Sequence, residues 1–189
     1  MARDHESDSR AIFIYNGHMQ TLNNLISKIQ NSQKTLFILC GLPYSGKSYV
    51  VRQLQSATDV KVVAIDDIFS VQGFDWDANA LPGAEEWAII FNESYDQVRQ
   101  ALISGNNVLY DSTNQTVTSR DKLRDVAKSV GADTKVIYIK CSTDTVFKRW
   151  EENQKNPTRS VVSRGLVQQT IDMFEEPTED ENVIVVSNH

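Results

Sequence analysis

Residues 35–48 read Thr35-Leu-Phe-Ile-Leu-Cys40-Gly41-Leu-Pro-Tyr-Ser-Gly46-Lys47-Ser48. The first six residues are an apolar run of strand length, and the remainder reads G-x-x-x-x-G-K-S directly before a helical segment. A strand, this motif and a helix, in that order, are typical of a phosphate-binding loop, or P-loop. The stretch therefore predicts a β-strand over 35–40, a loop that wraps around a phosphate group, and a helix from about residue 47.

Each fixed position of this loop has a physical reason. Gly41 and Gly46 let the backbone curl closely enough for its N–H groups to form an anion-binding nest. The N-terminus of the following helix adds backbone donors and a favourable dipole. Lys47 supplies a mobile positive charge for the β- and γ-phosphates, and Ser48 supplies a hydroxyl ligand for Mg²⁺. We therefore assign nucleotide binding to Gly41, Pro43, Tyr44, Ser45, Gly46, Lys47, Ser48 and Tyr49.

Short apolar runs alternate with helical segments along the rest of the chain. Strands that are apolar throughout and alternate with helices are typical of a parallel sheet covered on both faces. The sequence therefore predicts one α/β domain over 19–189, with its core at 35–186. The predicted strands are 35–40, 60–65, 107–110, 135–139 and 182–186, and the predicted helices are 20–32, 47–56, 85–104, 119–130, 143–153 and 163–174.

Composition indicates an ordinary globular protein and excludes several classes. The chain has 189 residues, a formal net charge of −6 and 40% apolar residues. The chain contains no run of 18 apolar residues, so the sequence predicts no transmembrane helix. The acidic balance disfavours a general nucleic-acid or membrane binder. Cys40 and Cys141 each lie at the end of an apolar run, which favours free thiols in a reducing compartment, the cytoplasm. Residues 1–18 are polar and lack the apolar core of a signal peptide, so we expect a flexible tail.

Carboxylates follow two of the predicted strands at their carboxyl ends, where sheets of this kind bind ligands. Asp66 and Asp67 end the second strand, and a carboxylate there can orient and deprotonate an acceptor hydroxyl. Because neighbouring strand residues face opposite ways, we expect one of the pair, Asp66, to serve the site. The alternative is that one of them only caps the next segment. Asp111 ends the third strand, where it can hold the Mg²⁺ shell.

A basic segment over 148–164 stands out in this acidic chain. Asn156-Pro157-Thr158 interrupts the helical pattern, so we expect a helix, a lid at about 153–164 and a second helix. A cationic lid would neutralise the transferring phosphoryl group and exclude water, with Arg149 and Arg164 as the leading candidates. The alternative is a solvated helix face with weak ion pairs. The acid-rich stretch 172–181 is expected to be solvated surface.

With these motifs the sequence resembles the small P-loop kinases related to phage-type polynucleotide kinase, zeta toxins, chloramphenicol phosphotransferase and the seryl-tRNA kinases. The resemblance covers 35–186 and rests on the 41–48 loop, on Ile65-Asp66-Asp67 and on Gly105-Asn-Asn-Val-Leu-Tyr-Asp111-Ser-Thr-Asn114. It implies a three-layer α/β/α fold, a five-stranded parallel sheet in the order 2-3-1-4-5, a lid after strand four, and ATP as the donor.

The resemblance predicts an ATP-dependent phosphotransferase that moves the γ-phosphoryl group to a hydroxyl of a small molecule. Polynucleotide kinases carry an Arg where this chain has Ile65 and a second lid Arg where it has Asn153, which disfavours a nucleic-acid 5′-hydroxyl as acceptor but keeps it as an alternative. A second alternative is an ATP-binding switch that acts through a protein partner, with the first 34 residues as the binding element. The expected catalytic residues are Lys47, Asp66, Arg149 and Arg164, and the expected metal ligands are Ser48 and Asp111.

Overall fold

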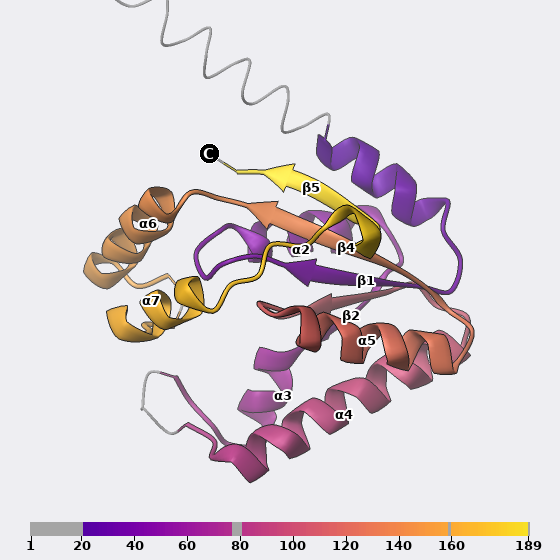
Figure 1. The fold of residues 1–189 in the computed structure, drawn as a ribbon, viewed down its shortest axis with the longest axis horizontal. Helices are drawn as coiled ribbons and strands as arrows, with labels where there is room; N and C mark the ends of the chain where they lie inside the picture. The colour runs from indigo at the N-terminus through magenta and orange to yellow at the C-terminus, as the bar shows by residue number, and fades with distance from the viewer. Residues whose placement is uncertain (1–20, 77–80, 159, 189) are drawn as a thin grey trace, which may run out of the picture.

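The computed structural model describes residues 21–76, 81–158 and 160–188 (Figure 1). The expected tail over 1–18 lies outside the described residues. A helix at residues 21–30 comes first. The elements that follow are β1 (Thr35–Cys40), α2 (Lys47–Ala57), β2 (Lys61–Ala64), α3 (Ile65–Val71), α4 (Ala84–Ile103), β3 (Val108–Asp111), α5 (Val117–Ser129), β4 (Asp133–Lys140), α6 (Thr143–Lys155), α7 (Arg164–Asp172), the 3₁₀ turn η1 (Glu179–Glu181) and β5 (Val183–Ser187).

The five strands form one parallel sheet in the order β2-β3-β1-β4-β5, which confirms the predicted order. β1 lies at the centre, with Leu36 opposite Val108 of β3 and Thr134 of β4. Because all strands run the same way, the segments that follow them meet at one edge of the sheet, and α6 and α7 lie beyond that edge (Figure 1). This is the edge at which a sheet of this kind binds ligands.

Helices cover both faces of the sheet, so the predicted three-layer α/β/α fold is confirmed. Alternate side chains of β1 enter opposite layers, as the two-residue period of a strand requires. Leu36 and Ile38 are buried with residues of α3, α4 and α5, whereas Phe37 and Leu39 are buried with residues of α2 and the first helix. Figure 1 shows α4 and α5 on one side of the sheet and the first helix on the other.

The helix at residues 21–30 is a core element. Leu22, Leu25 and Ile29 are spaced for one helix face and are almost completely buried. The Gln30 amide donates to the Ala57 carbonyl oxygen at the end of α2, over 3.0 Å. The apolar face of this helix is therefore occupied by its own domain and is not available to a protein partner.

The start of α3 corrects the sequence prediction for the second strand. β2 ends at Ala64, and Ile65 already begins a helix whose buried residues are Ile65, Ile68 and Phe69. Asp66 and Asp67 therefore lie in the first turn of a helix and not at a strand end. The argument that strand residues face opposite ways does not apply to them, and both are exposed.

The acid-rich stretch 172–181 is not solvated throughout, which is a second correction. Glu181 is 4% exposed and pairs with Arg120, a completely buried residue of α5. The rest of the stretch follows the expectation, since Asp172, Glu175, Glu176, Glu179 and Asp180 are exposed.

Candidate functional site

The P-loop connects β1 to α2 at the carboxyl edge of the sheet. Gly46 is the N-cap of α2 and has φ 105°, in the left-handed region that favours glycine. A Cβ at Gly41 would lie 2.8 Å from the backbone oxygen of Ile139, so only glycine fits beside β4. The helix begins with no side-chain cap. Its first N–H groups are therefore the kind of donors that bind an anion.

Lys47 and Ser48 occupy the first turn of α2. The Lys47 ammonium group donates to the carbonyl oxygens of Gly41 and Leu42, over 2.8 and 2.9 Å. The lysine side chain therefore spans the loop from its last residues to its first. Ser48 is exposed beside it. The first turn of α2 thus carries a cation and a hydroxyl, the residue types that can bind a phosphate and its Mg²⁺.

The three strands β2, β3 and β1 bring the expected carboxylates to the edge that carries the P-loop. Asp111 ends β3, the strand hydrogen-bonded to β1, and lies opposite Ala64 at the end of β2. Asp66 follows Ala64 by two residues, in the first turn of α3. The Gly41 N–H donates to the Thr113 carbonyl oxygen over 3.2 Å, which ties the segment after Asp111 directly to the P-loop.

The turn after β3 has the structural role that its residue types favour. Asn114 is buried with φ 47°, and its side-chain amide donates to the Leu39 carbonyl oxygen over 2.6 Å. Its own carbonyl oxygen accepts a hydrogen bond from Arg120 over 3.0 Å. Asn114 therefore fixes the end of β3 against the end of β1, and with it the relative positions of Asp111 and the P-loop.

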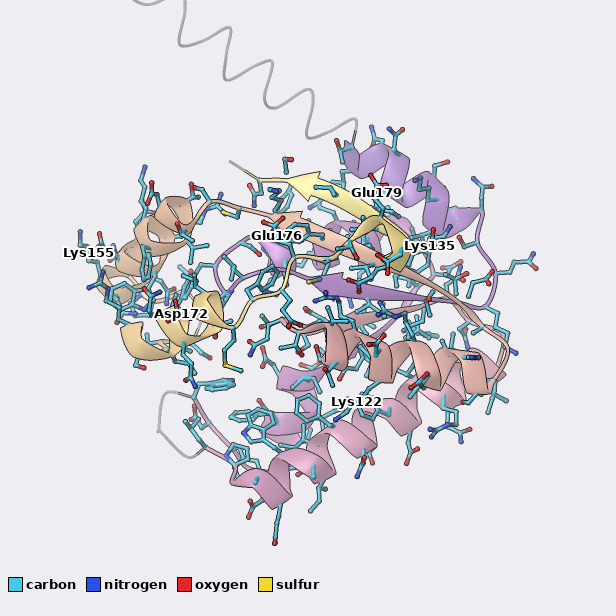
Figure 2. The ribbon with its side chains drawn as sticks, in the orientation of Figure 1. Lys122, Lys135, Lys155, Asp172, Glu176 and Glu179 are labelled. Carbon is cyan, nitrogen blue, oxygen red and sulfur yellow. The ribbon has the colours of Figure 1, made fainter. Side chains whose placement is uncertain are left out.

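The two candidate lid arginines, Arg149 and Arg164, make different contacts. The Arg149 guanidinium donates to the carbonyl oxygens of Tyr44 and Ser45, over 3.2 Å each, so it lies against the P-loop. Arg164 begins α7 and lies over the Phe147 ring, 5.1 Å from its centroid. α6 extends to Lys155, which is exposed at the end of that helix away from the sheet (Figure 2).

A pocket of about 960 Å³ opens between the P-loop, α2 and α6. Gly46 and Ser48 line it on the P-loop side, and Arg149 and Asn153 line it from α6. Asn188, which directly follows β5, completes the wall; sequence reasoning did not identify it, although its place after a strand was a usable signal. A cavity of this size, with cations and amides in its wall, suits a nucleotide. The other lining residues are Tyr44, Tyr49, Arg52, Glu152, Asn156 and Thr158.

The two cysteines near the site are free thiols. Burial raises the pKa of the Cys40 thiol to about 12, against the opposing effect of the Arg120 and Lys47 charges. Burial also raises the pKa of the Cys141 thiol, although the Arg149 charge opposes the shift. Both shifts favour the protonated thiol, which disfavours these cysteines as nucleophiles in a transfer reaction.

The donors at this edge fit Mg²⁺. In the described part of the chain no three His, Cys, Asp or Glu side chains converge as a metal cluster. Mg²⁺ does not need one beside a nucleotide, because it keeps several waters and binds through one or two carboxylates together with substrate phosphates. The Ser48 hydroxyl and the Asp111 carboxylate are the oxygen donors that suit it here.

No described helix has the length and apolarity to cross a bilayer.

A comparison with known families identifies the family of this chain. The profile of a family described as AAA domain (AAA_33) matches residues 36–177, from β1 through α7 and the segment after it. The chain belongs to this family of AAA domains. The match includes the whole P-loop and Asp111, and it ends before β5 and Asn188. Together with the solved structures that share its fold, the match confirms the predicted resemblance to small P-loop kinase-like proteins.

Several solved structures share the fold of this AAA domain. Chaetomium thermophilum Kti12 in complex with ADP-AlF3 is 19% identical, with a TM-score of 0.63 over 80% of this chain and 88% of its own. A gluconokinase from Sinorhizobium meliloti 1021 is 17% identical, with a TM-score of 0.56 over 82% of each chain. A chain of the Pnkp1/Rnl/Hen1 RNA repair complex is 21% identical, with a TM-score of 0.63 over 74% of this chain and 43% of its own. At these identities the likeness establishes the fold.

Proposed function

We propose that this AAA domain is an ATP-dependent kinase that transfers the γ-phosphoryl group to a hydroxyl of a small-molecule acceptor. One observation carries the proposal: three neighbouring strands, β2, β3 and β1, deliver Asp66, Asp111 and the P-loop to one edge of the sheet. A phosphate cradle with carboxylates beside it is the arrangement that phosphoryl transfer needs, because this chemistry depends on positioning and charge stabilisation.

In this proposal the P-loop binds the phosphates through its backbone N–H groups and the Lys47 ammonium group. Lys47 would exchange its hydrogen bonds to the loop carbonyls for phosphate oxygens. Ser48 and Asp111 would hold Mg²⁺, which neutralises phosphate charge when bound. Asp66, exposed in the first turn of α3, would orient the acceptor hydroxyl and take its proton. Arg149 places positive charge beside the loop.

A small acceptor is favoured over a nucleic acid on two grounds. The chain has a net charge of −6, which repels a polyanion. Ile65, where polynucleotide kinases carry an Arg, is buried and apolar.

The alternative of a switch that acts through a protein partner has less support, because the helix at residues 21–30 uses its apolar face for the core. The free thiols Cys40 and Cys141 favour the cytoplasm as the compartment.

The test is a transfer assay with Mg²⁺ and γ-labelled ATP. A small-metabolite extract and hydroxyl-ended oligonucleotides are offered separately, and Lys47→Ala serves as the inactive variant. Lys61→Ala is the matched control, because Lys61 is exposed at the start of β2. We expect label in the metabolite pool with the wild type and with Lys61→Ala, and at least about a hundredfold less with Lys47→Ala.

The other outcomes separate the alternatives. Label in the oligonucleotides that disappears with Lys47→Ala would show a nucleic-acid 5′-hydroxyl kinase. Label released only as inorganic phosphate, with slow turnover, would favour the nucleotide-dependent switch. Equal labelling by wild type and Lys47→Ala would contradict any role of the P-loop in transfer.

A further inference from the structure

The outer side of the P-loop is held by hydrogen bonds that phosphate binding alone does not explain. A loop that turns its N–H groups inward toward an anion turns carbonyl groups outward. Those carbonyls need donors of their own when they are buried. Ser45 is completely buried, and Tyr44 is 4% exposed. The donors to the carbonyl oxygens of these two residues therefore determine how well the conformation of the P-loop is fixed.

Two side chains from distant parts of the chain donate to these carbonyls. The Nη1 amino group of Arg149, on α6, donates to both the Tyr44 and the Ser45 carbonyl oxygen, over 3.2 Å each. Asn188 donates its side-chain amide to the Ser45 oxygen over 2.6 Å. The two donors are also joined to each other, because Arg149 donates to the Asn188 side-chain oxygen over 3.2 Å.

Asn188 is itself anchored by the sheet. Its backbone N–H donates to the Lys140 carbonyl oxygen over 2.9 Å, which continues the β4–β5 ladder past β5. Its side-chain nitrogen lies so close to Gly46 that a Cβ on this glycine would be 2.1 Å away. The amide is therefore fixed between the sheet, α6 and the last turn of the P-loop.

We propose that Asn188 is a positioning residue for the P-loop. Together with Arg149 it holds the Tyr44 and Ser45 carbonyls outward, so that the loop's N–H groups stay directed at the phosphates. This inference deepens the proposed function and rests on it, since it assigns the residue a part in phosphate binding. It also gives Arg149 a defined role: the guanidinium acts through the loop carbonyls it contacts.

The experiment compares equilibrium affinities for ATP and for inorganic tripolyphosphate by calorimetry with the full chain and Mg²⁺. The variants are Asn188→Ala, and Asn188→Asp, which keeps the acceptor for Arg149 but replaces the donor to Ser45 with a carboxylate oxygen. Asn92→Ala is the matched control, because Asn92 is exposed on α4. Circular dichroism verifies that each variant is folded.

We expect Asn188→Ala to weaken both ligands by the same factor, about fivefold, as the loss of one buried hydrogen bond implies. Asn188→Asp should weaken both at least as much, and Asn92→Ala should weaken neither. Amide hydrogen exchange of residues 41–48 without ligand should be faster in Asn188→Ala. Arg149 and Asn188 are hydrogen-bonded to each other. The loss of affinity in the double variant Arg149→Ala/Asn188→Ala should therefore differ from the sum of the losses in the two single variants.

Two results would overturn the role of Asn188 and leave the proposed function standing. One is unchanged affinity and unchanged hydrogen exchange in both Asn188 variants. The other is a loss for ATP but not for tripolyphosphate, which would show that Asn188 contacts the base or ribose. A wild-type protein that binds neither ligand would overturn the proposed function, and the inference with it.

Discussion

The guanidinium group of Arg120 and the carboxylate of Glu181 form a buried, two-point ion pair, with Nε–Oε2 at 2.7 Å and Nη2–Oε1 at 2.8 Å. The second terminal nitrogen of Arg120 donates to the carbonyl oxygens of Asn114 and Glu175, over 3.0 Å each. Arg124 reaches the same carboxylate over 2.5 Å. The ion pair thus connects α5, the turn after β3 and the segment before β5. The pair supports the edge of the sheet that carries Asp111 and the P-loop.

Glu181→Gln should destabilise the protein by about 3 kcal/mol, because it leaves the buried Arg120 charge without its counter-charge. Urea unfolding at pH 7 measures the change. Glu179→Gln is the matched control on the same turn, where Glu179 lies at the surface (Figure 2), and it should change the free energy of unfolding by less than about 0.5 kcal/mol. Equal effects of the two substitutions on the free energy of unfolding would show that the ion pair does not stabilise the protein.

The same pair predicts how stability depends on pH. Burial raises the pKa of Glu181, but hydrogen bonds from Arg120 and Arg124 and the positive charge of Arg120 outweigh burial and lower it to about 2. A pKa that is lower in the folded state gives stability that is complete above the unfolded value and is lost as pH falls through the folded value. The difference in unfolding free energy between wild type and Glu181→Gln should therefore be constant above about pH 5 and shrink toward pH 2. A difference that stays constant down to pH 3 would contradict the assigned shift.

Asp66→Asn should keep ATP affinity and lose most transfer, by about a hundredfold or more, because it removes the proposed proton acceptor. Asp67→Asn is a close control. Both residues are exposed in the first turn of α3, so both substitutions remove the same favourable charge from the helix N-terminus. Transfer rate and ATP affinity are measured for each. Loss of transfer in Asp67→Asn instead would assign the role of proton acceptor to Asp67. Full activity in both variants would show that neither carboxylate of α3 takes part in the transfer.

Gly41→Ala should destabilise the protein by about 2 kcal/mol or more, since the new methyl group would lie 2.8 Å from the Ile139 backbone oxygen and β4 cannot move away cheaply. Gly165→Ala is the control in α7, where the nearest atom is 4.0 Å away, and it should be neutral or slightly stabilising. Thermal unfolding compares the two. A Gly41→Ala protein as stable as the wild type would show that the approach of the loop to β4 is not tight.

Much of the fold follows from local patterns in the chain. The apolar run 35–40 and the glycine-lysine motif after it place β1, the P-loop and α2, and the structure has β1 at the same bounds. Gly105 and Gly131 take left-handed backbone angles after α4 and α5, as their position after a helical pattern predicts. Such patterns report burial and backbone preference within a few residues, so they identify elements without saying which distant side chains meet.

The remainder depends on contacts between distant segments. The apolar run 60–65 passes from β2 into α3 without a break in hydrophobicity, so only packing shows that Ile65 begins a helix. Glu181 looks like surface until the fold brings Arg120, 61 residues earlier, to its side. Asn188 meets Ser45 across 143 residues. The motif at 41–48 is therefore enough to identify a phosphate-binding loop, whereas the strand order decides what supports it, because a buried charge or carbonyl is stable only where the fold brings it a partner.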